Sequence, residues 1–278
     1  MLSGDLYDFV ISEQNIYNSI YSLESYIFEK GLLDKNDIKL FNDLHDKYNF
    51  KLINDIIKKC QSQLESIFND NKLFDINVFF KIKKYDYEND IIEYRPIHTA
   101  DLKTQICIVS LLNVIVFNDK NGKRELSDVS KLIPSNFYGN IPSTDVKNIF
   151  YDWHIKYNEY NKDVISKYNL CEQNGEYKYE VRLDLENFFP SINPAIIYNI
   201  LLEKLKVTYQ DDDQKTLEVI LEKLLFFNIT NISECYKQYY NNKDCEKIVE
   251  SEKIYPSLGI PQGLPQAYYF GNICMSEI

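Results

Sequence analysis

The segment VRLDLENFFPSI, residues 181–192, decides how the rest of the chain is interpreted. Apolar and polar residues alternate up to Asp184, which predicts a strand that ends at this acid. A carboxylate at the end of a buried strand is costly unless it has a partner, and Mg²⁺ is one such partner. Phe189 follows five residues later, where its ring can stand beside the same ion. The simpler alternative is a helix-capping Asp184, with Phe188 and Phe189 in the core.

A second segment, GIPQGLPQAYYFGNI, spans residues 259–273. Glycine and proline bracket Gln262, which predicts an open turn where backbone and side-chain amides can approach a ligand closely. A helix is expected to begin at this turn. The alternative is an ordinary turn and helix start without a ligand.

Composition sets wide bounds on the function. The chain has 278 residues, of which 45% are apolar and 14% aromatic, enough for a large core. Glycine and proline number only 8 each, which favours long helices over a sandwich of many turns. The net charge of −11 argues against a broad phosphate-binding surface, although a local basic groove does not need a positive total. Lysines that could line such a groove are Lys58, Lys59, Lys81, Lys83 and Lys84.

Cysteine and histidine residues are scattered. The 6 cysteines form no C-x-x-C pair and the 3 histidines stand apart, so neither a zinc site nor a disulfide scaffold is expected. The first residues lack the pattern of a signal peptide, and no stretch reaches the ~20 apolar residues of a membrane span. We therefore expect a cytoplasmic protein without a membrane partner.

Hydrophobic periodicity predicts an α+β protein. In chain order, the expected elements are helices over 12–69, a hairpin over 77–97 with a polar tip at 86–90, a buried helix over 102–117 capped by Asp101, a polar loop over 118–126, a helix over 143–169 capped by Ser143 or Thr144, a hairpin turn at Asn174–Gly175 before the strand to Asp184, and helices over 193–206, over 213–227 and after 263.

Together the two segments resemble motifs A and B of the reverse transcriptase family. The family pattern is an acid at a strand end, a Phe-Phe-x-Ser-Ile context, Pro-Gln-Gly and a helix ending in asparagine. Here these are Asp184, Phe188–Ile192, Pro261–Gly263 and Asn272, and 78 positions separate Asp184 from Gln262 (262 − 184). The resemblance implies the fingers and part of the palm of a right-hand polymerase over 71–278, after a helical N-terminal extension over 1–70.

The resemblance also implies roles for single residues. Asp184, helped by the carbonyl of Leu185, would bind catalytic Mg²⁺ in a two-metal site. Phe189 would lie under the sugar and select dNTPs over rNTPs. Gln262 and Gly263 would contact the nucleotide and the templating pair.

Upstream segments extend the resemblance. YRPIHTADLKTQ, residues 94–105, is similar to the fingers segment of group II intron-like enzymes, which implies that Arg95 and Lys103 hold the triphosphate. SNFYGN, residues 135–140, and the helix with Trp153 resemble bacterial abortive-infection and defence-associated reverse transcriptases. These relatives imply antiphage DNA synthesis with or without an RNA template, and homo-oligomers. The partners would be dNTPs, an RNA template and the DNA product.

Three departures from the family pattern stand out. Leu264–Ala267 replace the serine-containing start of the motif B helix, and Glu186 and Asn187 replace the basic and small residues of intron enzymes. No Tyr-x-Asp-Asp follows motif B before residue 278. We expect the second carboxylate pair and the thumb to come from residues beyond 278 or from a partner chain.

Tyr209–Asp213 reads YQDDD, but it lies between the two motifs. Acids favour a helix N-terminus, so we interpret this segment as the start of the helix over 213–227. Two alternatives to a defence enzyme stay open. One is a retron or group II intron-type reverse transcriptase, and the other is a catalytically incomplete polymerase-like subunit that binds nucleic acid or scaffolds a partner.

Overall fold

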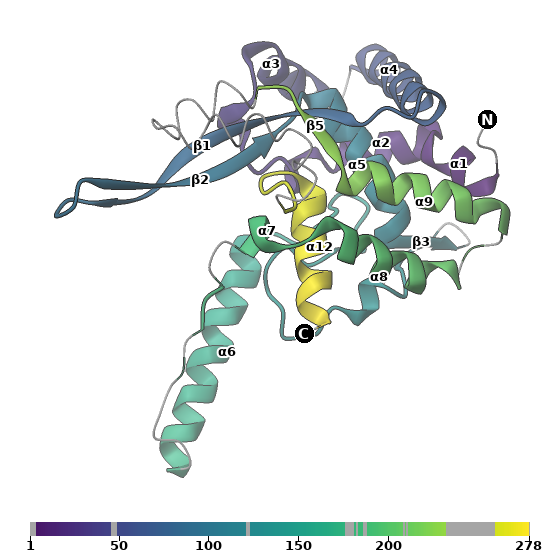
Figure 1. Cartoon of the computed structure of the whole chain (residues 1–278). Helices are drawn as coiled ribbons and strands as arrows, with labels where there is room; N and C mark the ends of the chain where they lie inside the picture. Colours follow the sequence, from purple (N-terminus) through teal and green to yellow (C-terminus); the bar gives the residue numbers. More distant parts are fainter. Residues whose placement is uncertain are drawn as a thin grey trace.

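The computed structural model describes residues 4–45, 49–120, 123–175, 181, 183–185, 188–207, 209, 211–231 and 259–277. It is a mixed α+β fold with small sheets, as the sequence predicts (Figure 1). The elements are α1 (Asp5–Val10), α2 (Glu13–Tyr21), η1 (Leu23–Ser25), η2 (Lys30–Leu32), α3 (Lys35–Leu44), α4 (Phe50–Asn69), β1 (Phe74–Asp86), β2 (Ile91–Thr99), α5 (Leu102–Val116), β3 (Phe117–Lys120), β4 (Lys123–Leu126), η3 (Ser130–Leu132), α6 (Trp153–Asn174), α7 (Phe188–Ser191), α8 (Pro194–Lys206), α9 (Asp211–Leu225), β5 (Phe227–Ile229) and α12 (Pro265–Ser276).

Helix α5 is the centre of the core. Every one of its residues except Lys103 is buried, because its sequence is apolar on nearly all sides. The Asp101 carboxylate accepts the Thr104 backbone N–H at 2.6 Å, so the predicted cap is confirmed. Helices α1, α2, α4, α8, α9 and α12 contribute to the same cluster of buried side chains. This core runs across residue 70, and a separate N-terminal extension stays a prediction.

The predicted hairpin is confirmed and is longer than expected. Strands β1 and β2 pair antiparallel from Asn77↔Thr99 to Asp86↔Ile91, with an irregularity between Ile82 and Lys84. Strand β5 pairs in parallel with the start of β1, so the sheet order is β2-β1-β5. The far half of the hairpin projects from the body of the protein (Figure 1).

Residues 118–120 and 123–126, which fall in the predicted loop, belong to a second pair of strands. Strands β3 and β4 pair from Phe117↔Leu126 to Lys120↔Lys123. The Arg124 guanidinium lies 3.5 Å from the centre of the Phe117 ring and donates a hydrogen bond to Asn113 Oδ1 at 2.9 Å. The loop prediction was wrong because these tertiary contacts hold a polar segment that has no strand periodicity.

The predicted helix over 143–169 was wrong at both ends. Helix α6 begins at Trp153, where the Asp152 carboxylate accepts the His154 backbone N–H at 2.8 Å. Residues 142–150 form a loop closed by the Pro142–Phe150 bridge instead. The helix ends at Asn174 because Gly175 adopts a left-handed φ of 61°.

The predicted hairpin turn at Asn174–Gly175 is therefore a helix end, since the same glycine suits both structures. Residues 181 and 183–185 adopt no strand, which overturns the predicted strand to Asp184 where the chain is described. Residues 176–180, 182, 186 and 187 lie outside the described residues.

The YQDDD segment opens a helix, as predicted. Helix α9 begins at Asp211, and Asp213 Oδ1 accepts the Leu6 backbone N–H at 3.1 Å. The Tyr209 hydroxyl donates to the Val114 carbonyl at 3.1 Å, and burial raises the pKa of this phenol to about 12. The segment thus ties α9 to α1 and α5.

Candidate functional site

The two segments that resemble motifs A and B meet through their backbones. The Ile260 N–H donates a hydrogen bond to the Phe189 carbonyl at 3.1 Å. Gly259 has a φ of 92°, and an added Cβ would overlap Phe189 O and the Pro190 backbone. Only glycine permits this approach, so the contact depends on a specific residue in the second segment.

The Pro-Gln-Gly turn is held from its other side by β2. The His98 N–H donates to the Gln262 carbonyl at 2.6 Å. Gly263 has a φ of 112°, and an added Cβ would overlap His98 O. Burial lowers the pKa of His98 to about 4, so its ring is neutral near pH 7. The turn thus lies between α7 and the β1–β2 hairpin.

Aromatic rings cover the junction. The Phe189 ring lies 5.2 Å from that of Phe188 and 5.4 Å from that of Tyr268, both edge to face. Tyr268 in turn packs on Phe28 at 4.5 Å. Gly271 of α12 faces the two phenylalanines, and a Cβ there would lie 3.2 Å from Phe188 Cε1. The small residue lets α12 approach α7 closely.

Arg95 lies within electrostatic reach of this aromatic group. It is exposed on β2, directly across from Lys81, which forms an ion pair with Glu29. The pKa of Tyr268 is raised to about 12, mainly by burial and also by Glu29, while Arg95 and a hydrogen bond to the Gly263 backbone act to lower it. The structure therefore groups Arg95, Phe189, Gln262 and Gly263 of the predicted site.

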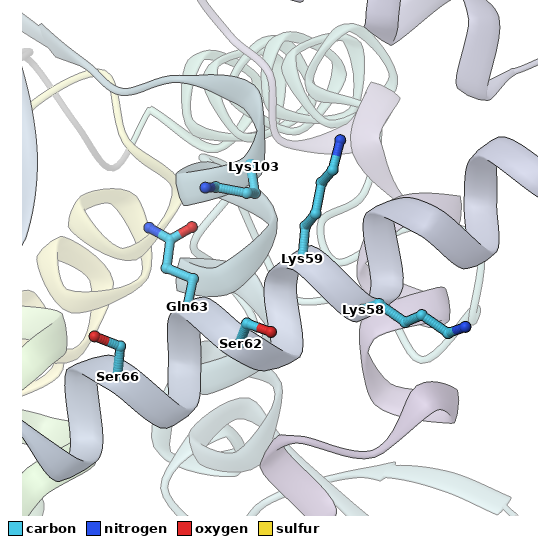
Figure 2. A pocket seen from close by; sticks show the side chains of 6 residues that line it. All are labelled: Lys58, Lys59, Ser62, Gln63, Ser66 and Lys103. Atoms are coloured by element: carbon cyan, nitrogen blue, oxygen red, sulfur yellow. The ribbon is translucent and has the colours of Figure 1, made fainter.

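Lys103 lies in a different hollow. It lines a pocket of about 550 Å³ between α4 and the start of α5 (Figure 2). Within the described ranges, none of the three lysines there forms an ion pair. The lining residues are Lys58, Lys59, Ser62, Gln63, Ser66 and Lys103. The structure does not bring Lys103 to the Arg95 group, and its predicted role in triphosphate binding stays a prediction.

Asp184 and Leu185 are both exposed, Leu185 by 53%. They precede α7 in a stretch without regular structure, so the described residues here do not form the buried strand end that was predicted to hold a metal ion. Among the described residues, no group of three or more His, Cys, Asp or Glu side chains could hold a metal ion. Asp184 supplies one carboxylate, so these residues alone do not complete the predicted magnesium site.

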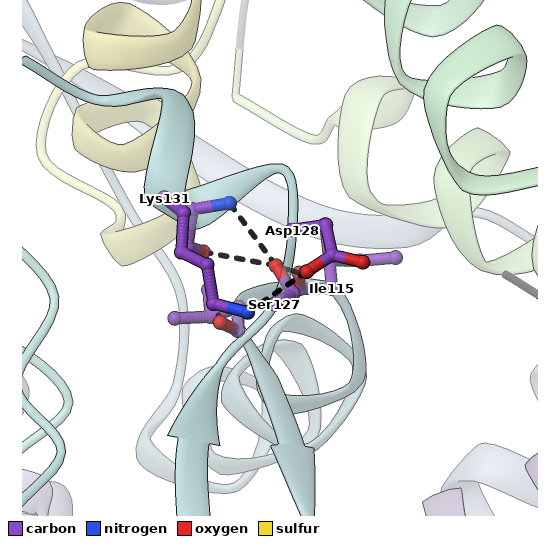
Figure 3. A network of polar contacts seen from close by, with 6 residues as sticks. Ile115, Ser127, Asp128 and Lys131 are labelled. Carbon is purple, nitrogen blue, oxygen red and sulfur yellow. Dashed lines mark hydrogen bonds and ion pairs between the residues drawn. The ribbon is translucent and has the colours of Figure 1, made fainter.

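Helix α12 is anchored at its far side by the turn between β4 and η3. The Ser127 hydroxyl donates to the Ile115 carbonyl at 2.7 Å, and the Lys131 ammonium donates to Asp128 at 2.8 Å (Figure 3). Ser130 Oγ lies 2.9 Å from the Tyr269 hydroxyl of α12. This network fixes α12 against the end of α5, and so positions the turn that precedes it.

Gln266, one of the departures from the family pattern, is buried. Its side chain is 1% exposed, and Oε1 has no hydrogen-bond partner among the described residues. A buried polar atom without a partner costs about 1–3 kcal/mol. Within the part of the chain that the structure describes, Gln266 therefore places an amide oxygen without a hydrogen-bond partner in the buried first turn of α12, which is unfavourable for folding.

An aromatic pocket next to the junction was not predicted as a site. Its volume is about 450 Å³, and its lining residues are Phe28, Tyr138, Gly139, Asn140, Trp153, Tyr157, Tyr160 and Tyr268. The spacing of Trp153, Tyr157 and Tyr160, four and then three residues apart on one helix face, is the signal that could have found it. The other side chains come from distant parts of the chain.

No protein-family model, curated protein or solved structure matches this chain. None of the described helices has both the length and the apolar run needed to cross a membrane.

Proposed function

We propose that this chain supplies the fingers and part of the palm of a reverse transcriptase-type DNA polymerase. The polymerase adds dNTPs to a primer hydroxyl in antiphage defence, with or without an RNA template. One observation carries the proposal. The backbone contact of Phe189 with Gly259 and Ile260 joins the two segments from which the polymerase resemblance was read, although 70 positions (259 − 189) separate them.

The described side chains suit nucleotide binding. Phe189 and Tyr268 offer ring surfaces for a sugar or a base. Gln262 is held by its backbone and keeps its side chain partly exposed. Arg95 offers a cation for phosphate oxygens. Polymerases of this type use Mg²⁺ to neutralise phosphate charge. Asp184 is the ligand we propose from this chain, and the remaining ligands have to come from outside the described residues.

The test is incorporation of labelled dNTPs by the full-length gene product with Mg²⁺, with and without an RNA template. We expect Asp184→Ala to abolish incorporation, because one carboxylate of the metal site is lost. Asp55→Ala is the matched control, since Asp55 is an exposed acid on α4. Full incorporation by a folded Asp184→Ala protein would remove this acid from the site.

Sugar selection tests Phe189 separately. We expect Phe189→Ala to raise rNTP use relative to dNTP use about tenfold, because the ring no longer clashes with a 2′-hydroxyl. The control is Phe188→Ala, which changes the adjacent ring. An unchanged rNTP/dNTP ratio in Phe189→Ala would reject the sugar-gate role.

A second candidate is a catalytically incomplete subunit that binds nucleic acid. It is favoured by the exposure of Asp184 and by the lack of a metal-holding group among the described residues. Nucleic-acid binding without incorporation by the full-length product, under every template condition, would support this candidate over the enzyme.

A further inference from the structure

The pocket lined by Phe28, Tyr138, Gly139, Asn140, Trp153, Tyr157, Tyr160 and Tyr268, called here the aromatic pocket, has no part in the roles assigned above except through Tyr268. The three α6 rings that line it are substantially exposed, with Trp153 at 54%, Tyr157 at 55% and Tyr160 at 43%. Exposed aromatic surface gathered in one hollow marks a binding site more often than scattered exposed rings do.

The floor and walls of this pocket are held in place. Asn272 of α12 donates its side-chain N–H groups to the carbonyls of Gly139 and Asn140, at 2.8 and 3.2 Å. Asn140 adopts a left-handed φ of 49°, an uncommon conformation that these contacts support. The Tyr138 hydroxyl donates to Asp163 of α6 at 2.7 Å. The loop is thus tied to α12 on one side and to α6 on the other.

The tyrosine rings that line the hollow stand at angles to one another. Tyr138 and Tyr160 lie 5.5 Å apart at 63°, and Tyr157 and Tyr160 lie 6.2 Å apart at 33°. A planar ligand inserted beside them would gain aromatic contact with their exposed surface. Tyrosine and tryptophan lose little conformational entropy in such contacts, because each has only two side-chain torsions.

The aromatic pocket shares one wall residue with the candidate nucleotide site. Tyr268 lines the pocket and also packs on Phe189, with ring centres 5.4 Å apart. The two places are therefore adjacent, and linked nucleotides can occupy both. This adjacency favours a nucleic-acid strand over an unrelated ligand.

We propose that the aromatic pocket stacks unpaired bases of a single-stranded nucleic acid beside the nucleotide site. The inference rests on the proposed function and adds a path for the strand. Charges around the pocket are mixed, since Lys156 pairs with Glu159 and Lys167 with Asp163. Binding here therefore depends on base stacking more than on phosphate attraction, and its salt dependence is shallow.

Trp153 makes the test direct because it is the only tryptophan in the chain, so intrinsic tryptophan fluorescence reports on the pocket alone. The full chain is titrated with a single-stranded oligothymidylate and with an abasic strand of equal length. We expect the oligothymidylate to quench the fluorescence and the abasic strand to leave it unchanged. Tyr157→Ala and Tyr160→Ala should each weaken binding about 5- to 100-fold.

Tyr168→Ala is the matched control, since Tyr168 is exposed on the same helix and does not line the pocket. Its affinity for the oligothymidylate should equal that of the unmodified chain. Circular dichroism confirms that each variant keeps its helix content. Equal quenching by the abasic strand, or unchanged affinity in both Tyr157→Ala and Tyr160→Ala, would overturn base stacking.

A proline-rich peptide is the competing ligand for an aromatic groove. Quenching by a polyproline peptide and not by the oligothymidylate would replace our proposal with peptide binding. Incorporation by the full-length gene product separates this inference from the polymerase assignment. If that product fails to incorporate dNTPs under every template condition but the chain still binds the strand through the pocket, the pocket stands and the polymerase proposal falls. If the full-length product incorporates dNTPs but the oligothymidylate does not quench the Trp153 fluorescence, the polymerase proposal stands and base stacking in the pocket falls.

Discussion

Helices α5 and α6 begin alike and end up in opposite surroundings. Each starts after an aspartate that accepts a backbone N–H, Asp101 for α5 and Asp152 for α6. In α5, which has 15 residues, all but Lys103 are buried; in α6, which has 22, none is buried. Figure 1 shows α6 extending away from the body of the protein. The local start signal is therefore shared, and packing alone separates a helix buried in the core from one that presents an exposed surface.

The polar residues of α5 and α6 also have different structural roles. In α5, Ser110 and Asn113 join a buried network in which Asn113 Nδ2 donates to Asn15 Oδ1 at 3.0 Å. In α6, Lys167 pairs with Asp163 at 2.8 Å on an exposed face. Hydrogen bonds from Lys167 and Tyr138 lower the pKa of the Asp163 carboxyl. The α5 network fixes neighbours in the core, and the α6 contacts steady the wall of the aromatic pocket.

The largest expected effect comes from opening a cavity beneath α5. Leu112 is fully buried, so Leu112→Ala should lower the free energy of unfolding by about 2–5 kcal/mol. Urea unfolding followed by far-ultraviolet circular dichroism measures the change. A loss below about 1 kcal/mol would contradict the central place of α5 in the core.

Acid should weaken the junction next to α5. The folded-state pKa of His98 is about 4, below the 6.5 of an exposed histidine, so the unfolded chain binds the proton first. The part of the folding stability that depends on a neutral His98 ring is fully present above pH 6.5. It is lost as the pH falls from 6.5 to 4, and it does not change further below pH 4. The loss reaches about 3 kcal/mol, measured by urea unfolding across this range.

His98→Gln should flatten that part of the pH profile, because the titrating ring is gone. His154→Gln on α6 is the control, since His154 is exposed, and the loss of stability that depends on His98 should persist in that variant. An identical slope in the unmodified chain and in His98→Gln would assign the acid sensitivity to other groups.

Breaking the buried polar network should cost less than opening the cavity. Asn113→Ala removes the partner of Asn15 Oδ1 and of the Arg124 guanidinium, and we expect a loss of about 1–3 kcal/mol. Urea unfolding again provides the measurement. Ser66→Ala, which removes an exposed hydrogen bond to Asp70, is the control and should change stability far less.

The smallest effect is expected on α6. Leu170 is exposed by 58%, so Leu170→Ala should change the free energy of unfolding by no more than about 0.5 kcal/mol. The same residue change at Leu112 makes the pair a direct comparison of the two helices. A large loss at Leu170 would mean that α6 is covered in the folded protein in solution.

Much of the fold was predictable from local pattern. The burial of α5, the hairpin of β1 and β2, helix α8 and the helix start at the YQDDD segment all follow from periodicity and capping. Two local predictions were wrong. Gly175 ends a helix instead of turning a hairpin, and residues 118–120 pair with residues 123–126 as strands, because each sequence pattern suits two local structures equally well.

The candidate site, like the fold, was predictable from the sequence only in part. The Phe-Phe and Pro-Gln-Gly segments were singled out from residue types alone, and glycines at 259 and 263 were required for reasons of backbone conformation. The exposure of Asp184 was not predictable, because alternation of apolar residues says only that a strand is suitable, not that neighbours cover it. The separation of Lys103 from Arg95 was equally hidden, since both lie close together in sequence.

Sequence by itself determined the buried helix α5, the β1–β2 hairpin and the segments that carry chemistry-bearing side chains, because those properties depend on neighbours within a few residues. Only the tertiary structure decided that Phe28, Tyr138 and Tyr268 meet the aromatic face of α6 around one hollow. Contacts between residues more than 100 positions apart depend on how the whole core packs around α5. No local pattern encodes that arrangement.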